Sequence, residues 1–216
     1  MQKLSKGAQT KNKIINQSNQ LYNKSDTFLT LGELADSLNL SRGLITNHFP
    51  KKELLLLAIF KNYEVRLKEL IESYNPDAST ITLQHLFEYY SKVMDLMYEY
   101  RFAISYIFVN PIRDADLKEY IRKTYLNNKR RLKERTDYLV TIGLFSDKIL
   151  NEDYFEAFNF QHSNLLTTWI INYRLYDYTE SYQQRKSVYM RGLINCFIPF
   201  LTEDAMKEIH TIIKTN

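Results

Sequence analysis

Glycine and proline are scarce in this chain, whose 216 residues include only 5 Gly and 4 Pro. Both residue types interrupt helices, because Gly leaves the backbone too free and Pro removes a helical hydrogen bond. A fold of many short strands would need far more of the turns in which Gly and Pro are common. The sequence therefore predicts an all-α protein with long helices.

Residues 1–60 predict three helices, of which the second and third are short and close together. The first is expected over about residues 9–22, where apolar side chains recur at helical spacing. Thr30 and Ser41 are typical N-caps for the next two helices, and Asn39 tolerates the left-handed backbone that a sharp turn between them needs. Helices this short and this close must cross steeply. This is the geometry of a helix-turn-helix motif, whose second helix projects its outer side chains.

The rest of the chain predicts a C-terminal helical bundle. A long helix is expected from Lys51 until Asn75-Pro76 ends it. Later breaks fall at residues that end helices or cannot continue them, such as Gly143 and Pro199. The helices expected between these breaks cover about residues 82–100, 101–109, 115–142, 151–176, 183–198 and 203–214.

The positive charge of the chain is concentrated at its N-terminal end. The net charge is +4, and residues 1–60 hold eight Lys and Arg against four Asp and Glu, which accounts for all of it. An end with this charge suits contact with phosphate groups.

The sequence lacks the marks of a secreted, membrane-spanning or metal-bound protein. Cys196 is the only cysteine, so no internal disulfide can form, and no Cys and His residues have zinc-site spacing. No apolar signal segment opens the chain, and the longest apolar run, Leu54–Phe60, is far shorter than the roughly 20 residues of a membrane span. We therefore expect a cytoplasmic protein with no metal, no cofactor and no membrane partner.

The stretch Thr30–Leu54, TLGELADSLNLSRGLITNHFPKKEL, resembles the helix-turn-helix signature of the TetR family. A Thr opens the second helix, and Leu-Ala, a turn, Ser-x-Gly, His-Phe and Lys-Glu-Leu follow in order. The resemblance implies a homodimeric transcriptional regulator, usually a repressor, on a roughly palindromic double-stranded DNA operator. It further implies release by a small-molecule effector, with DNA binding in residues 1–60 and effector binding and dimerisation in residues 61–216.

Within this resemblance, the exposed positions of the third helix are candidates for base contacts. Arg42 suits guanine and Asn47 suits adenine, because a guanidinium and a side-chain amide can each make two hydrogen bonds to a base edge. Asn39 and Thr46 depart from the Gly and Tyr common in the family, and that Tyr often touches the DNA backbone. Without the resemblance, the same residues would fit an ordinary solvated helix surface. The candidates for bases are Arg42, Gly43, Leu44 and Asn47, and those for phosphates are Thr30, Thr46, His48 and Lys52.

Aromatic residues are abundant, with 17 Tyr and 12 Phe, and they crowd residues 98–108 and 154–178. Side chains of this kind hold apolar or aromatic ligands in helical bundles, although most of them also suit a packed core. His162 fits a core histidine as well as a ligand contact. The candidate ligand-binding residues are Phe102, Tyr106, Phe158, His162 and Trp169.

A basic run at residues 129–135 admits two interpretations. It fits a second nucleic-acid site, and it fits the solvated face of a long helix with acidic residues nearby. The apolar stripe on the same helix favours the solvated face.

No catalytic function is indicated, since the four His are dispersed and no glycine-rich phosphate loop, Gly-x-Ser-x-Gly or His-Glu-x-x-His motif occurs. Two alternatives stay open. One is the same fold without ligand control, regulated by a partner or by abundance. The other is a helical enzyme or adaptor with a vestigial head.

The wide apolar faces of residues 151–176 and 183–198 predict a dimer interface near Trp169 and Leu193.

Overall fold

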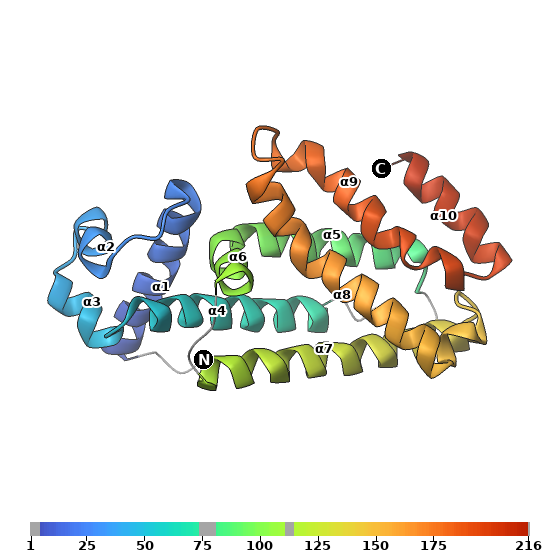
Figure 1. Cartoon of the computed structure of the whole chain (residues 1–216), viewed down its shortest axis with the longest axis horizontal. Coiled ribbons are helices and arrows are strands. Elements are labelled where there is room, and N and C mark those ends of the chain that lie inside the picture. The colour runs from blue at the N-terminus through green and yellow to red at the C-terminus, as the bar shows by residue number, and fades with distance from the viewer. Residues whose placement is uncertain (1–4, 74–80, 111–114, 216) are drawn as a thin grey trace. The chain divides into compact units, whose positions relative to one another are not determined.

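The structure, a computed structural model, describes residues 5–73, 81–110 and 115–215. Helices account for most of these residues, and no β-strand occurs among them (Figure 1). This confirms the prediction of an all-α fold with a helix-turn-helix head and a C-terminal helical bundle. The helices are α1 (Lys6–Ser25), α2 (Leu31–Ser37), α3 (Arg42–His48), α4 (Lys52–Ser73), α5 (Leu83–Glu99), α6 (Arg101–Val109), α7 (Ala115–Thr141), α8 (Glu152–Leu175), α9 (Tyr182–Asn195) and α10 (Glu203–Thr215), with 3-10 helices η2 (Asp147–Leu150) and η3 (Ile198–Phe200).

The chain forms two compact units. The first unit contains residues 1–70 and 96–111, and so holds α1 to α3, nearly all of α4, and α6. The second contains residues 71–95 and 112–216, with most of α5 and α7 to α10. The first unit is therefore discontinuous in sequence, because α6 packs with α1, which ends more than seventy residues before it.

Side-chain caps begin the two short helices of the head. The Thr30 hydroxyl accepts a hydrogen bond from the Glu33 amide at 3.2 Å, while the Glu33 carboxylate accepts one from the Thr30 amide at 2.7 Å. Ser41 accepts a hydrogen bond from the Leu44 amide at 3.2 Å. Each cap satisfies an amide that has no partner within its helix, so both predicted N-caps are confirmed.

The turn between α2 and α3 depends on a left-handed residue. Asn39 has φ of 52°, as its residue type predicted, and the next amide, of Leu40, donates to the Ala35 carbonyl at 2.9 Å. Leu34 of α2 and Ile45 of α3 are both fully buried. The turn thus brings two short helices into contact through one apolar side each and leaves the other side of α3 outward.

Asn23 of α1 joins the end of α5 to the start of α6. Its side-chain amide donates to the Glu99 carbonyl at 2.6 Å and accepts from the Phe102 amide at 3.1 Å, while Arg101 donates to the Asn23 carbonyl at 2.7 Å. Tyr100, the N-cap residue of α6, makes no side-chain capping bond of its own. Asn23 therefore supplies from another helix the partners that both helix ends lack.

The apolar run of α4 does not by itself show which side of the helix is buried. Leu54, the first apolar residue of the run, is 42% exposed, whereas Leu55 and Leu56 are buried. Because residues 54–60 are all apolar, periodicity alone cannot tell which side of the helix faces the core. The buried residues of α4 are Leu55, Leu56, Ile59, Phe60 and Tyr63.

The second unit has an aromatic core around a histidine. His162 of α8 is 5% exposed, and its Nε2 atom lies 2.8 Å from the Tyr90 hydroxyl of α5. The rings of Phe158 and Phe197 lie 5.6 and 5.5 Å from the imidazole. Burial, and then the nearby Arg135, lower the pKa of His162 to about 3. His162 is therefore a neutral, hydrogen-bonded core residue at physiological pH.

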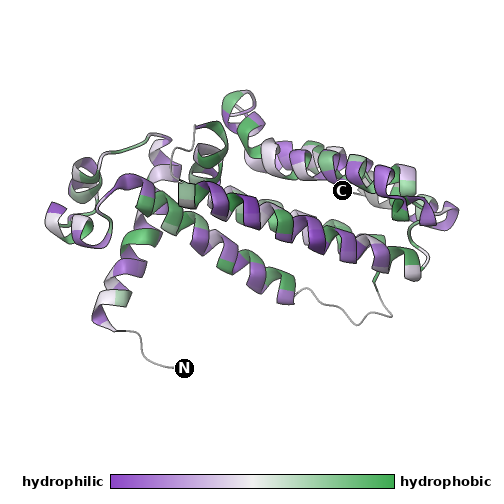
Figure 2. Ribbon diagram, turned by 60° about the horizontal axis from the view of Figure 1, so that its bottom comes forward, coloured by the Kyte–Doolittle hydropathy of each residue, from purple (hydrophilic) through white to green (hydrophobic). Residues whose placement is uncertain are grey.

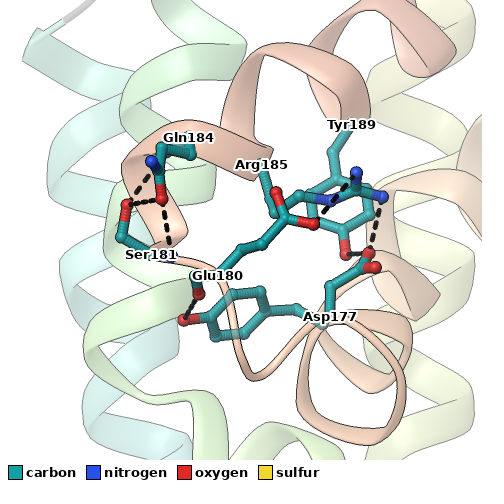
Figure 3. Close-up of polar contacts among 7 residues, drawn as sticks. Asp177, Glu180, Ser181, Gln184, Arg185 and Tyr189 are labelled. Carbon is teal, nitrogen blue, oxygen red and sulfur yellow. Dashed lines mark hydrogen bonds and ion pairs between the residues drawn. The ribbon is translucent and has the colours of Figure 1, made fainter.

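A polar network centred on Asp177 closes the turn between α8 and α9 (Figure 3). The Asp177 carboxylate accepts hydrogen bonds from the Tyr189 hydroxyl and, at 2.9 Å, from the Arg185 guanidinium, and both lower the pKa of Asp177. Ser181 and Gln184 form a capping box at the start of α9. These contacts stabilise the turn after which α9 packs against α8.

Hydrophobic and hydrophilic residues recur along each long helix instead of separating into continuous apolar segments (Figure 2). Within the part of the chain that the structure describes, no helix is both long enough and apolar enough to cross a membrane.

Gly143, just after α7, has φ of +75° and should resist replacement. A side chain there would meet no neighbouring atom within 4 Å, so the cost of Gly143→Ala is backbone strain alone, about 1–2 kcal/mol of unfolding free energy. Gly192→Ala is the matched control, because Gly192 lies inside α9 with equally open space and should gain up to about 1 kcal/mol. Urea unfolding measures both, and equal effects of the two replacements would contradict this account.

The low pKa of His162 predicts acid-sensitive stability. Between pH 6.5, the usual histidine pKa, and about pH 3, the unfolded chain binds a proton that the native core does not. The unfolding free energy therefore falls as the pH falls, by about 1.4 kcal/mol per pH unit well below 6.5. Compared with His162→Gln, the wild-type chain should lose about 2 kcal/mol more between pH 7.5 and 5. Chemical denaturation at several pH values measures this difference. Equal losses of unfolding free energy in wild type and His162→Gln would contradict the low pKa of His162.

Candidate nucleic-acid interface

One side of α3 is free to face a partner. Arg42, Gly43 and Asn47 are exposed and Leu44 is partly exposed, while Ile45 alone of this helix is fully enclosed. The four candidates for base contacts therefore lie together on the part of the helix that the core leaves uncovered. A helix anchored in this way can present its side chains to the major groove of DNA.

The two threonine candidates for phosphate contacts already use their hydroxyl protons. The Thr30 hydroxyl donates to the Glu33 carboxylate at 2.8 Å, and the Thr46 hydroxyl donates to the Arg42 carbonyl at 3.0 Å. A phosphate oxygen accepts hydrogen bonds and cannot donate them, so either threonine would have to exchange its present bond for a phosphate contact.

The other two phosphate candidates flank the junction between α3 and α4. His48 is the last residue of α3, and its ring centroid lies 6.5 Å from that of Phe49. Lys52 is the first residue of α4, and its Nζ atom lies 4.1 Å from the centre of the Phe28 ring. These four candidates thus come from three successive segments: Thr30 precedes α2, Thr46 and His48 lie in α3, and Lys52 begins α4.

The structure divides the five candidate ligand residues among three aromatic groups. Phe102 and Tyr106 belong to the first unit, and Phe158 and His162 to the core of the second. Trp169 stacks instead on Tyr182 of α9, with ring centroids 5.6 Å apart, and its indole nitrogen has no partner among the described residues. Helical spacing placed Phe158, His162 and Trp169 on one face, but different partners cover different parts of that face.

Most of the basic run on α7 is paired on the helix surface, as the solvated-face interpretation expects. Lys129 pairs with Glu156 at 2.6 Å and Arg130 with Glu134 at 2.6 Å. Arg135 departs from that interpretation, because its guanidinium turns inward and stacks 4.1 Å above the Tyr89 ring.

Three residues make long-range contacts that the sequence did not predict: Asn23, Phe28 and Arg135. Each acts on a residue far from it in sequence, so local periodicity gives no signal. An isolated aromatic in the polar segment before Thr30 was the one available hint for Phe28. In the described residues, no three His, Cys, Asp or Glu side chains gather as a metal site would require.

Comparisons with solved structures support the fold. A TetR-family transcriptional regulator from Marinobacter aquaeolei VT8 is 20% identical, with a TM-score of 0.77 over 95% of this chain and 97% of that one. A complex of SmeT with triclosan is 11% identical, with a TM-score of 0.64 over 91% and 93%. A protein described as a TetR-family regulator from Mesorhizobium loti MAFF303099 is 16% identical, with a TM-score of 0.60 over 92% and 100%. No curated protein matches the chain.

The family comparison gives the stronger result. The family model described as TetR, bacterial transcriptional repressor, matches residues 62–209. This span lies wholly outside the helix-turn-helix stretch Thr30–Leu54, so the two observations are independent. Because the match covers more than half of the 216 residues, the chain belongs to the TetR family of bacterial transcriptional repressors.

Proposed function

We propose that this protein is a homodimeric, cytoplasmic repressor that binds a palindromic DNA operator through α3. The observation that carries the proposal is the exposed side of α3, on a capped helix-turn-helix, in a chain of a repressor family. Family membership supports a regulatory function over an enzymatic one. DNA binding is assigned to residues 1–60, and dimerisation and effector binding to residues 61–216.

Arg42 and Asn47 are the proposed readers of base edges. Arg42 would pair with guanine and Asn47 with adenine, while Leu44 would contact a thymine methyl group. Gly43 has no atom within 4 Å of the position of a Cβ, which leaves α3 room for close approach to the groove. Thr30, Thr46, His48 and Lys52 would hold the backbone and fix the register of the helix.

The proposed dimer interface uses the outward residues of α8 and α9. The sequence placed it near Trp169 and Leu193, but these are 2% and 0% exposed and lie inside the chain's own core. Phe160 is 69% exposed, a high value for a phenylalanine, and further apolar residues are exposed on the same two helices. These exposed residues are Phe160, Leu165, Leu175 and Val188.

We also propose control by a small apolar or aromatic molecule. One solved structure of similar fold is a complex with triclosan, which supports ligand control in this architecture. Phe102, Tyr106, Phe158, His162 and Trp169 stay as candidates, now in three groups. Release of operator-bound protein by a panel of aromatic compounds tests this part, and a panel without effect would favour regulation by a partner or by abundance.

Replacements in α3 and α4 should separate base contacts from phosphate contacts. Arg42→Ala and Asn47→Ala should each weaken operator binding by about 1–3 kcal/mol and relax sequence preference. Lys52→Ala should weaken specific and non-specific binding alike and reduce the salt dependence by about one counterion. Selection of bound fragments from genomic DNA supplies the operator, and anisotropy titrations at several salt concentrations give the affinities.

The reverse pattern of effects on DNA binding would contradict this assignment of contacts. If Lys52→Ala changed sequence preference while Arg42→Ala and Asn47→Ala did not, α3 would not be the helix that reads the bases. Leu44→Ala gives an intermediate case, since it removes only an apolar contact with thymine.

Phe160→Glu should convert the dimer to folded monomers, because it places a charge in an apolar interface without disturbing the core of the chain. Leu193→Glu is the contrasting variant and should unfold the chain, since Leu193 is fully buried. Sedimentation gives the mass and circular dichroism the helix content. A dimer that persists in Phe160→Glu would move the interface away from this face of α8.

A further inference from the structure

Four aromatic rings from three segments stack in the first unit. Tyr22 of α1 lies 5.1 Å from Phe102 of α6 at an interplanar angle of 12°. Phe28, from the segment before α2, lies 4.6 Å from Tyr106 of α6 at 19° and 6.0 Å from Tyr22 at 23°. All four rings are therefore nearly parallel, an arrangement that offset stacking favours.

Lys52 ends this stack on the side of α4. Its Nζ atom lies 4.1 Å from the Phe28 centroid, well within the range of a cation–π contact. Among the described residues, no carboxylate forms an ion pair with Lys52. The Phe28 ring therefore contacts the Lys52 ammonium group on one side only. The N–H donors of that ammonium group stay available for an acceptor such as phosphate.

The ring of Phe28 packs against α6. Phe102 of that helix is 4% exposed, and Asn23 fixes the first turn of α6 to α1 by the hydrogen bonds described above. The ring of Phe28 has no helix of its own to orient it, so its position over Lys52 depends on Tyr106 and its stacking partners.

We propose that Phe28 is a positioning residue that holds the Lys52 ammonium group in place for a DNA phosphate, with Tyr106 of α6 as its support. The inference rests on the proposed function, in which Lys52 binds phosphate. A free lysine side chain samples many rotamers, and a ring that restricts it lowers the entropy lost when a phosphate is bound. A change in α6 that moves Tyr106 then alters the affinity for any DNA sequence.

This assignment differs from the pocket role that the sequence suggested for Tyr106. A residue that only lines a ligand pocket leaves ligand-free DNA affinity unchanged when it is replaced. A residue that supports Phe28 weakens DNA binding without any ligand present. Tyr106→Leu distinguishes the two roles, and we expect a loss of about two- to threefold in affinity for non-specific duplex DNA.

The experiment uses the full chain and a mixed-sequence duplex, so that no operator is needed. Anisotropy titrations at several salt concentrations compare wild type, Phe28→Leu, Lys52→Ala and the double variant. Phe28→Leu should weaken binding about two- to fivefold. In the Lys52→Ala background the same replacement should have no further effect, because the side chain that it positions is gone.

Two more variants separate positioning from folding. Trifluorophenylalanine at position 28 keeps the shape of the ring but weakens its negative face, so it should lose as much DNA affinity as Phe28→Leu. Phe28→Tyr keeps an electron-rich ring and should retain wild-type affinity. Tyr154→Leu is the matched control, because it removes a comparable contact, 4.7 Å from the Lys148 ammonium group, in the second unit and from a residue given no DNA role. It should leave DNA affinity unchanged.

Each result has one meaning. Wild type that binds no duplex at low salt overturns the proposed function and this inference together. Wild type that binds while Phe28→Leu and the fluorinated variant bind equally well overturns the inference alone. A Phe28→Leu effect that persists in the Lys52→Ala background also overturns it, since Phe28 would then act through the fold of the head.

Discussion

The hydrogen bonds of Asn23 determine how the first unit is built. The Asn23 side chain donates to the last carbonyl of α5, which Asn19 also contacts at 2.9 Å, and accepts from an early amide of α6. Neither α5 nor α6 provides a partner for these two groups. The second of these bonds gives α6 its place beside α1, although the two helices are far apart in sequence. The aromatic stack of Tyr22, Phe28, Phe102 and Tyr106 follows from that placement, and so does the position of Lys52 at its end.

The two units bury polar groups in different ways. The second encloses His162 as a neutral imidazole that shares a hydrogen bond with Tyr90, and its depressed pKa reflects the cost of placing a charge among aromatic rings. The first keeps its charged groups at the edge, where Lys52 contacts a ring and retains access to solvent. In the core of the second unit, the Arg135 guanidinium also turns inward over Tyr89, and its charge helps to depress the pKa of the neighbouring imidazole.

Family membership and the head motif rest on different parts of the chain. The family model matches residues 62–209, where the sequence itself offered no motif, whereas the resemblance came from Thr30–Leu54. The three solved structures compared above are at most 20% identical to this chain, so they support its fold and nothing about its operator or effector.

Local chemistry determined much of this protein from sequence alone. The caps at Thr30 and Ser41, the left-handed Asn39 and the break at Gly143 each depend on residues within about one turn, and each was predicted. The exposed side of α3 followed from the single buried position of Ile45. Tertiary structure alone decided the buried face of α4, the separation of Trp169 from Phe158, the inward turn of Arg135 and the contact of Phe28 with Lys52. The reason is physical: helical periodicity shows which residues share a face, but the packing of distant segments decides what covers that face.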